Sequence, residues 1–153
     1  MGDTRRRADP AVTAALLLEA VPPLVRLLRS ALQSGTGAVT LTQARILARL
    51  EAGPRLIGEL ATAMEVRAPT ASVAVDNLVR RGLVTRLADE ADRRQVLVAL
   101  TADGTRALSG ARHSQMQAVA ALLGRLDERE LRALETGLRG LVRTRTGQDA
   151  EAR

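Results

Sequence analysis

The fold is decided by residues 69–100, which read PTASVAVDNLVRRGLVTRLADEADRRQVLVAL. In the first part of this stretch apolar side chains recur at helical spacing, Pro69 suits a first turn, and Gly82 suits the residue after a helix end. From Leu83 the apolar period changes from about 3.6 residues to about 2, which is typical of strands. We therefore expect a helix followed by a β-hairpin, with the helix over 69–81, strands over 83–87 and 95–100, and a charged turn over 88–94.

Two short helices are expected upstream. Thr40 and Gln43 have the spacing of a capping box, in which both side chains satisfy amides at a helix start, and Gly53-Pro54 ends that helix. A shorter helix follows, with apolar residues at helical spacing up to Met64. A short helix, a tight turn, a second helix and a hairpin are together typical of a winged helix-turn-helix, which we expect over residues 40–100.

The flanking segments are predicted to be long apolar helices. A first helix is expected to run to about Ala20, with a kink or restart at Pro22-Pro23 and a helix to about Gln33, because proline interrupts a helix interior. Thr101 is expected to cap a long helix that ends near Leu126, and a last helix carries a stripe of leucines. This apolar surface exceeds what a small winged-helix core covers, and such surface usually marks an interface. The prediction is a mainly α fold with one β-hairpin, with dimerisation helices over 11–38 and 101–145 and flexible tails over 1–10 and 146–153.

The composition excludes several classes of function. The 153 residues contain no cysteine, no aromatic residue and a single histidine, His113. The absence of cysteine excludes disulfides, thiolate metal sites and cysteine nucleophiles, and one histidine excludes a multi-histidine site, so we expect no metal or cofactor. The absence of aromatic residues excludes the base-stacking platforms of single-strand-binding proteins. No uninterrupted apolar run approaches ~20 residues and no signal-peptide pattern appears, so we expect a cytoplasmic protein without membrane contact.

Net charge does not by itself indicate a nucleic-acid ligand. All 23 basic residues are arginines, and the net charge of +6 is spread evenly along the chain. The position of particular side chains is more informative. In a helix-turn-helix the second helix lies in the major groove of DNA. The inward face of the helix over 69–81 is expected to comprise Ala71, Ala74, Val75 and Leu78, which leaves its opposite face for DNA.

The outward residues of this helix and the arginines of the hairpin have distinct expected roles. Thr70 and Ser72 lie near the helix start, where they can bond phosphates or base edges. Val73 or the Thr70 methyl is expected to contact a thymine methyl, and Asn77 to read adenine. Arg80, Arg81 and Arg86 would lie toward the flanking backbone, whereas arginines at the wing tip suit the narrow minor groove of A·T-rich DNA. The predicted DNA-binding residues are Arg67, Pro69, Thr70, Ser72, Val73, Asn77, Arg80, Arg86, Asp92, Arg93 and Arg94.

The hairpin and its flanks resemble the MarR family of bacterial transcriptional regulators. Residues 92–104 read DRRQVLVALTADG and match that family's wing signature, in which an Asp-x-Arg tip and a hydrophobic strand precede Leu-Thr and a glycine three residues later. Residues 78–84, LVRRGLV, resemble the family's exit from the recognition helix. Residues 41–43 and 59–61 match its earlier helices. The resemblance covers residues 40–105 well, and the flanks agree in length, helicity and apolarity.

This resemblance implies a homodimer that is held by N- and C-terminal helices and binds a pseudo-palindromic operator. Family members typically act as repressors that release DNA when a small phenolic or anionic molecule enters a cleft beside the dimer helices. By the family pattern, Asp92 pairs with an arginine to fix the wing tip, and Arg94 enters the minor groove. The expected neighbourhood of the effector comprises Leu24, Leu28, Ile46, His113 and Met116.

The chain departs from the family pattern in two places, and other readings stay open. The helix after Gly53-Pro54 lacks the usual serine or threonine cap, and the recognition helix has Val73 and Asn77 where members often carry basic or hydroxyl residues. One alternative function is a winged-helix module for protein association or non-specific DNA binding. An enzyme is disfavoured by the absence of a phosphate-binding glycine loop and of a nucleophile elbow. Asp92 and Arg94 can equally form a simple hairpin ion pair, and His113 can be a packing residue.

Overall fold

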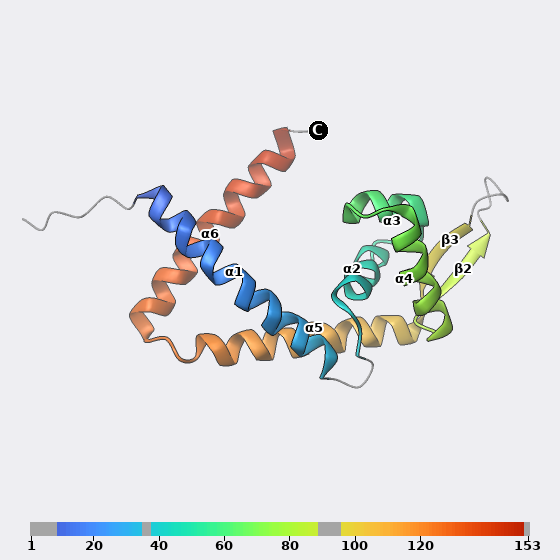
Figure 1. Ribbon diagram of the computed structural model, residues 1–153, viewed down its shortest axis with the longest axis horizontal. Coiled ribbons are helices and arrows are strands. Elements are labelled where there is room, and N and C mark those ends of the chain that lie inside the picture. Colours follow the sequence, from blue (N-terminus) through green and yellow to red (C-terminus); the bar gives the residue numbers. More distant parts are fainter. Residues whose placement is uncertain (1–8, 35–37, 89–95, 152–153) are drawn as a thin grey trace, which may run out of the picture. The chain divides into compact units, whose positions relative to one another are not determined.

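The computed structural model describes residues 9–34, 38–88 and 96–151, with side chains up to residue 144 (Figure 1). The chain forms two compact units, Met1–Met116 and Gln117–Arg153. Six helices and three short strands occur in the described residues. The mainly helical prediction is therefore confirmed.

A winged helix-turn-helix occupies the middle of the first unit, as the sequence predicted. Its helices and strands gather in one lobe in Figure 1. The strands form an antiparallel sheet in the order β1-β3-β2, with Val84 opposite Leu100 and Arg55 opposite Val98. The elements of the lobe are α2 (Leu41–Leu50), β1 (Arg55–Leu56), α3 (Ile57–Met64), α4 (Ala68–Arg80), β2 (Val84–Ala88) and β3 (Val96–Leu100).

The strand β1 is an addition to the predicted hairpin. Its two residues follow Gly53-Pro54, and they are too few to show the period of a strand in the sequence. The pairing of β1 with β3 joins residues more than 40 positions apart. The start of α3 also differs from the usual pattern, because Leu56 stands at the cap position and its amide donates to Glu59 Oε2 at 3.1 Å. Glu59 thus supplies only the half of a capping box in which the third helical residue accepts from the amide of the cap residue, and no side chain at position 56 caps the amides that a serine or threonine would reach.

The core of the lobe consists of aliphatic side chains and one methionine. Each helix contributes residues at helical spacing, and β3 contributes Val98. In α4 the buried residues are Ala71, Val75 and Leu78, as predicted, and Ala74 is half-buried. The largest fully buried side chains are Ile46, Leu47, Leu60, Met64, Val75, Leu78 and Val98.

The first helix, α1 (Pro10–Gln33), is continuous, so of the kink or restart expected at Pro22-Pro23 the restart is wrong. Each proline leaves the carbonyl four residues earlier without its helical donor. Those carbonyls belong to Leu18 and Glu19, which are both exposed, so water can replace the missing donors. The cost of the prolines is therefore too small to end the helix.

Length and composition alone make α1 long and apolar enough to cross a bilayer, with a mean hydropathy of 1.7 over its most apolar window and no buried residue in that window. A count of uninterrupted apolar runs does not reveal this helix, because polar residues such as Glu19 and Arg26 interrupt it. Leu32 at the other end of the helix is buried in the core of the lobe. Most of α1 thus exposes an apolar surface while its last turns join the lobe.

The two last helices are α5 (Ala102–Leu123) and α6 (Glu128–Glu151). The amide of Gly104 donates to the Thr101 hydroxyl at the start of α5, and a capping box joins Asp127 and Glu130 at the start of α6. A β-carbon on Gly104 would lie 1.9 Å from the carbonyl oxygen of Leu83, so only glycine allows this approach of α5 to the lobe. The leucine stripe of α6 is exposed.

Candidate nucleic-acid interface

The helix α4 presents a face to solvent that is opposite its buried residues. Pro69 and Thr70 in the first turn, Val73 one turn later and Arg80 at the end are exposed, with 67% of Val73 accessible. Arg67 stands at the cap position, and its side chain is also exposed and makes no capping bond. Ser72 is half-buried. The outward face of α4 therefore combines a helix start, a hydroxyl, an apolar contact residue and arginines at both ends, which is the chemistry that a DNA groove accepts.

An ion pair joins this helix to the hairpin. Arg86 on β2 donates from Nη2 to Asp76 Oδ1 on α4 at 2.5 Å, and both side chains are 44% exposed. The carboxylate offsets part of the charge that Arg86 would bring to a phosphate and holds its guanidinium beside α4. The pair thus fixes β2 against the outward side of α4.

Asn77 is held by a polar cluster around Gln43, which is only 7% exposed. Gln43 Nε2 donates to Asn77 Oδ1 at 2.8 Å, and Gln43 Oε1 accepts from the Thr40 amide at 2.9 Å and from Arg81 Nη1 at 3.2 Å. Arg81 also donates to the carbonyl of Ala38 at 2.7 Å. Asn77 and Arg81 therefore face α2, where they connect its first turn to the end of α4.

Sequence reasoning assigned Gln43 only a capping role and placed Asn77 and Arg81 toward DNA. A signal for the cluster was present, because Gln43 shares one helix face with Ile46, Leu47 and Leu50, all of them buried. A polar residue on a buried stripe needs hydrogen-bond partners from a neighbouring element. Those partners lie 34 and 38 positions further along the chain, so spacing within α2 does not reveal them.

The tip of the wing lies outside the described residues. Asp92, Arg93 and Arg94 fall in the segment between β2 and β3, so their predicted contacts stay predictions. The strands that lead to the tip are described, with Ala88 paired to Val96 at the far end of the ladder.

The five residues predicted to surround an effector have different environments. Leu24 and Leu28 on α1 are half-buried, Ile46 is fully buried in the core, and His113 and Met116 on α5 are exposed. A hollow of about 350 Å³ lies between the end of α1 and the start of α2, and none of the five lines it. The effector neighbourhood stays a prediction. The residues that line this hollow are Arg29, Gln33, Thr40, Leu41, Thr42 and Arg45.

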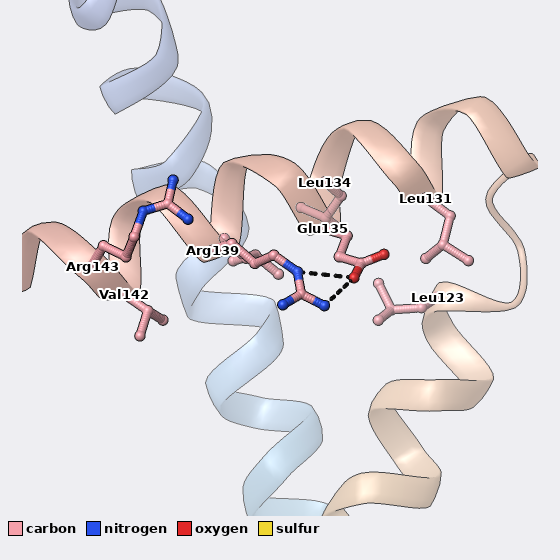
Figure 2. Close-up of a pocket in the computed structure, with 8 residues that line it drawn as sticks. Leu123, Leu131, Leu134, Glu135, Arg139, Val142 and Arg143 are labelled. Atoms are coloured by element: carbon pink, nitrogen blue, oxygen red, sulfur yellow. Dashed lines mark hydrogen bonds and ion pairs between the residues drawn. The ribbon is translucent and has the colours of Figure 1, made fainter.

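The second unit carries an apolar groove of about 690 Å³ along α6 (Figure 2). Figure 2 shows Leu131 and Leu134 on α6 and Leu123 at the end of α5 at this groove. Arg139 donates to Glu135 Oε1 from Nε at 3.0 Å and from Nη2 at 2.6 Å. An exposed apolar stripe with charged residues beside it is typical of a helix that packs against a partner.

Comparison with known proteins agrees with this geometry. The model of the MarR family matches residues 39–95. A MarR family protein from Bacillus stearothermophilus is 28% identical, with 91% of this chain and 99% of that chain covered and a TM-score of 0.72. A mutant of MarR from E. coli is 25% identical, with 90% and 99% covered and a TM-score of 0.75.

A mutant of MepR from S. aureus, bound to an oligodeoxyribonucleotide, has the same fold. It is 21% identical, with 86% of this chain and 96% of that chain covered and a TM-score of 0.65. The comparison with curated proteins gives no match. The family resemblance of the sequence is confirmed over residues 39–95, and the described part of this stretch has the winged helix-turn-helix fold of the MarR proteins that it matches.

Proposed function

We propose that this protein is a bacterial transcriptional regulator that binds double-stranded DNA as a homodimer. The observation that carries the proposal is the exposed face of α4, which lies over the buried Ala71, Val75 and Leu78 and beside the hairpin. In this arrangement α4 enters the major groove and the hairpin reaches the flanking DNA. The MepR complex supports the proposal, because that protein has the same fold and its structure contains DNA.

The described side chains have two proposed roles: some contact phosphates and position the protein on DNA, and others contact bases and read the sequence. Arg67 and Arg80 at the two ends of α4 contact phosphates, and Thr70 and Ser72 bond phosphates or base edges at the helix start. Pro69 starts the helix, and Val73 packs against a thymine methyl. Arg86 reaches the backbone from its contact with Asp76. Asn77 holds α4 in place through the hydrogen bond that its Oδ1 accepts from Gln43.

The wing completes the interface in this proposal. Arg93 and Arg94 enter or flank the minor groove, whose negative potential is greatest where A·T tracts narrow it. Asp92 fixes the tip through an arginine. These roles follow from the family pattern and the position of the tip between β2 and β3.

A second copy of the chain covers the exposed apolar surfaces of α1 and α6. Leu16 and Leu18 on α1 are 62% and 72% exposed, and Leu138 and Leu141 on α6 are 48% and 55% exposed. A monomer with so many leucines exposed to water is prone to non-specific association, and a symmetric dimer prevents this by burying them. A bilayer is a poor alternative for α1, because Glu19 and Arg26 would each cost about 2.5–3.5 kcal/mol near its centre. The proposal therefore places the dimer in the cytoplasm without membrane contact.

Repression and release by a small molecule complete the proposed function. Two recognition helices of one dimer must match half-sites about 34 Å apart, so a small change in their separation removes one of the two contacts. A phenolic or anionic effector would act near Leu24, Leu28, Ile46, His113 and Met116. Arg29 and Arg45 beside the neighbouring hollow suit a negatively charged ligand.

The experiment is selection of bound sequences from random duplex DNA, followed by titration of the best sequence and of a scrambled version. We expect a palindromic sequence and an affinity ratio of at least ~10³ at physiological salt. An equal affinity for both DNAs would favour the non-specific module. Absence of DNA binding, together with retained self-association, would favour a protein-association module.

A further inference from the structure

The first three turns of α5 are attached to the lobe at two places. At the inner place, the Thr101 hydroxyl donates to the carbonyl of Gly82 at 2.7 Å, and the Thr101 amide donates to the carbonyl of Leu83 at 3.2 Å. Gly104 lies against the same Leu83 carbonyl. Because these contacts all reach backbone carbonyls of the lobe from the helix start, they fix where α5 begins.

The outer attachment is a single ion pair between α5 and the end of α2. Arg112 donates from Nη1 to Glu51 Oε1 and from Nη2 to Glu51 Oε2, both at 2.6 Å. Hydrogen bonding to Glu51 and the carboxylate charge raise the pKa of Arg112, although partial burial opposes the shift. Two parallel bonds of this kind fix the orientation of both groups as well as their distance.

The ion pair lies far along α5 from the contacts at the helix start, so it restrains the direction of the helix. The buried residues of α5 are Gly104, Leu108 and Ala111, and Arg112 comes directly after the last of them. Eleven residues separate Thr101 from Arg112, which is about 16 Å of helix. The ion pair is thus the outermost attachment of α5 to the lobe among the contacts described.

Side chains do not fill the space on one side of α5 where this helix meets the lobe. A hollow of about 540 Å³ lies between α5 and the lobe, with Thr105 of α5 on one side and Leu50, Pro54 and Leu100 on the other. Glu51 lines the same hollow. On this side the ion pair adds a restraint on α5 to the one that the buried packing of Leu108 and Ala111 supplies elsewhere.

We propose that Glu51 and Arg112 are a positioning pair that sets the direction in which α5 leaves the DNA-binding lobe. In the dimer of the proposed function, on which this inference rests, that direction sets the separation of the two recognition helices. The pair therefore determines which spacing between half-sites the dimer accepts, and it leaves the affinity of each lobe for a single half-site unchanged.

The test compares Glu51→Gln, Arg112→Gln and the charge reversal Glu51→Arg with Arg112→Glu. Arg106→Gln is the matched control, because the side chain of Arg106 is 74% exposed and pairs with Asp103 inside α5. DNAs with the selected half-sites and a spacer of the selected length, or one base pair longer or shorter, are titrated with the full-length dimer. A half-exposed pair contributes up to about fivefold, so two pairs in the dimer give a loss of spacer discrimination of up to about 25-fold.

We expect both single variants to lose this discrimination, the charge reversal to regain most of it, and all variants to bind a single half-site as the wild type does. Unchanged discrimination in Arg112→Gln, or an equal loss in Arg106→Gln, would overturn the proposal. An equal loss of half-site affinity would also overturn it, because a merely destabilised lobe has that effect.

A second measurement needs no DNA and therefore separates this proposal from the proposed function. Hydrogen exchange of the α5 amides after Arg112 is compared between the wild type, Arg112→Gln and the control. We expect exchange up to about fivefold faster in Arg112→Gln only. Equal exchange rates in all three proteins would refute the positioning role, even where the wild-type chain binds no operator.

Discussion

Replacement of Gln43 by methionine tests whether the buried polar cluster holds α2 and α4 together. Methionine keeps the length and nearly the volume of the side chain but removes its hydrogen bonds. Those bonds join Gln43 to Thr40, Asn77 and Arg81 at 2.9, 2.8 and 3.2 Å. Gln43 is 7% exposed, so water cannot easily replace them.

The expected loss follows from the kinds of bond involved. A neutral hydrogen bond contributes about 1 kcal/mol net, and a bond to a charged group contributes about 1.5 kcal/mol or more. Two effects reduce this loss of stability. Arg81 still donates to the Ala38 carbonyl, and the methionine side chain is apolar like the buried residues on the same face of α2. We expect the free energy of unfolding to fall by about 2–3 kcal/mol.

The assay is denaturant unfolding followed by far-ultraviolet circular dichroism, because a chain without aromatic residues has no tryptophan or tyrosine signal. All proteins are compared at one concentration, since the stability of a dimer depends on it. Arg49→Ala, at an exposed position of the same helix, is the control and should change stability by less than about 0.5 kcal/mol. A Gln43→Met variant as stable as the control would refute the reasoning.

Three further predictions concern the fold, the DNA surface and the dimer. Gly104→Ala places a β-carbon 1.9 Å from the Leu83 carbonyl oxygen and should lower the thermal midpoint sharply. Gly110→Ala has nothing within 4 Å of the new β-carbon and should leave the free energy of unfolding unchanged or raise it by up to ~1 kcal/mol. A more stable Gly104→Ala than Gly110→Ala would contradict the described packing. Arg80→Ala should weaken binding to specific and scrambled DNA alike and reduce the salt dependence by about one phosphate contact per protomer, and a loss confined to the specific DNA would instead show base reading. Leu138→Asp, at a 48% exposed position, should convert dimers to folded monomers in sedimentation experiments, and an unchanged dimer would exclude α6 from the interface.

Local signals allowed the lobe to be predicted. The capping box at Thr40, the apolar spacing of α4 and the change of period at Leu83 each depend on neighbours within a few residues, and each is present in the structure. The start of α5 at Ala102 could also be predicted from a local signal, because Thr101 caps the helix.

What could not be predicted depends on partners that are distant in the chain. Asn77 has the spacing of a DNA-reading residue, but Gln43, which lies 34 positions earlier, takes its side-chain oxygen. The strand β1 exists only because β3 pairs with it, and Arg112 meets Glu51 across 61 positions. Pro22-Pro23 lie within α1, where the carbonyls that they leave without helical donors belong to the exposed residues Leu18 and Glu19, and spacing along the sequence does not reveal this exposure.

The central claim is that the outward face of α4 meets DNA bases, and Val73→Asp tests it most directly. Val73 is 67% exposed, so the change leaves the core intact, and Ser109→Asp adds the same charge at an exposed position of α5 as a control. In fluorescence anisotropy with the selected DNA, we expect Val73→Asp to lose at least about 100-fold in affinity and the control to bind almost as the wild type does. Equal binding by Val73→Asp and the wild type would contradict the account.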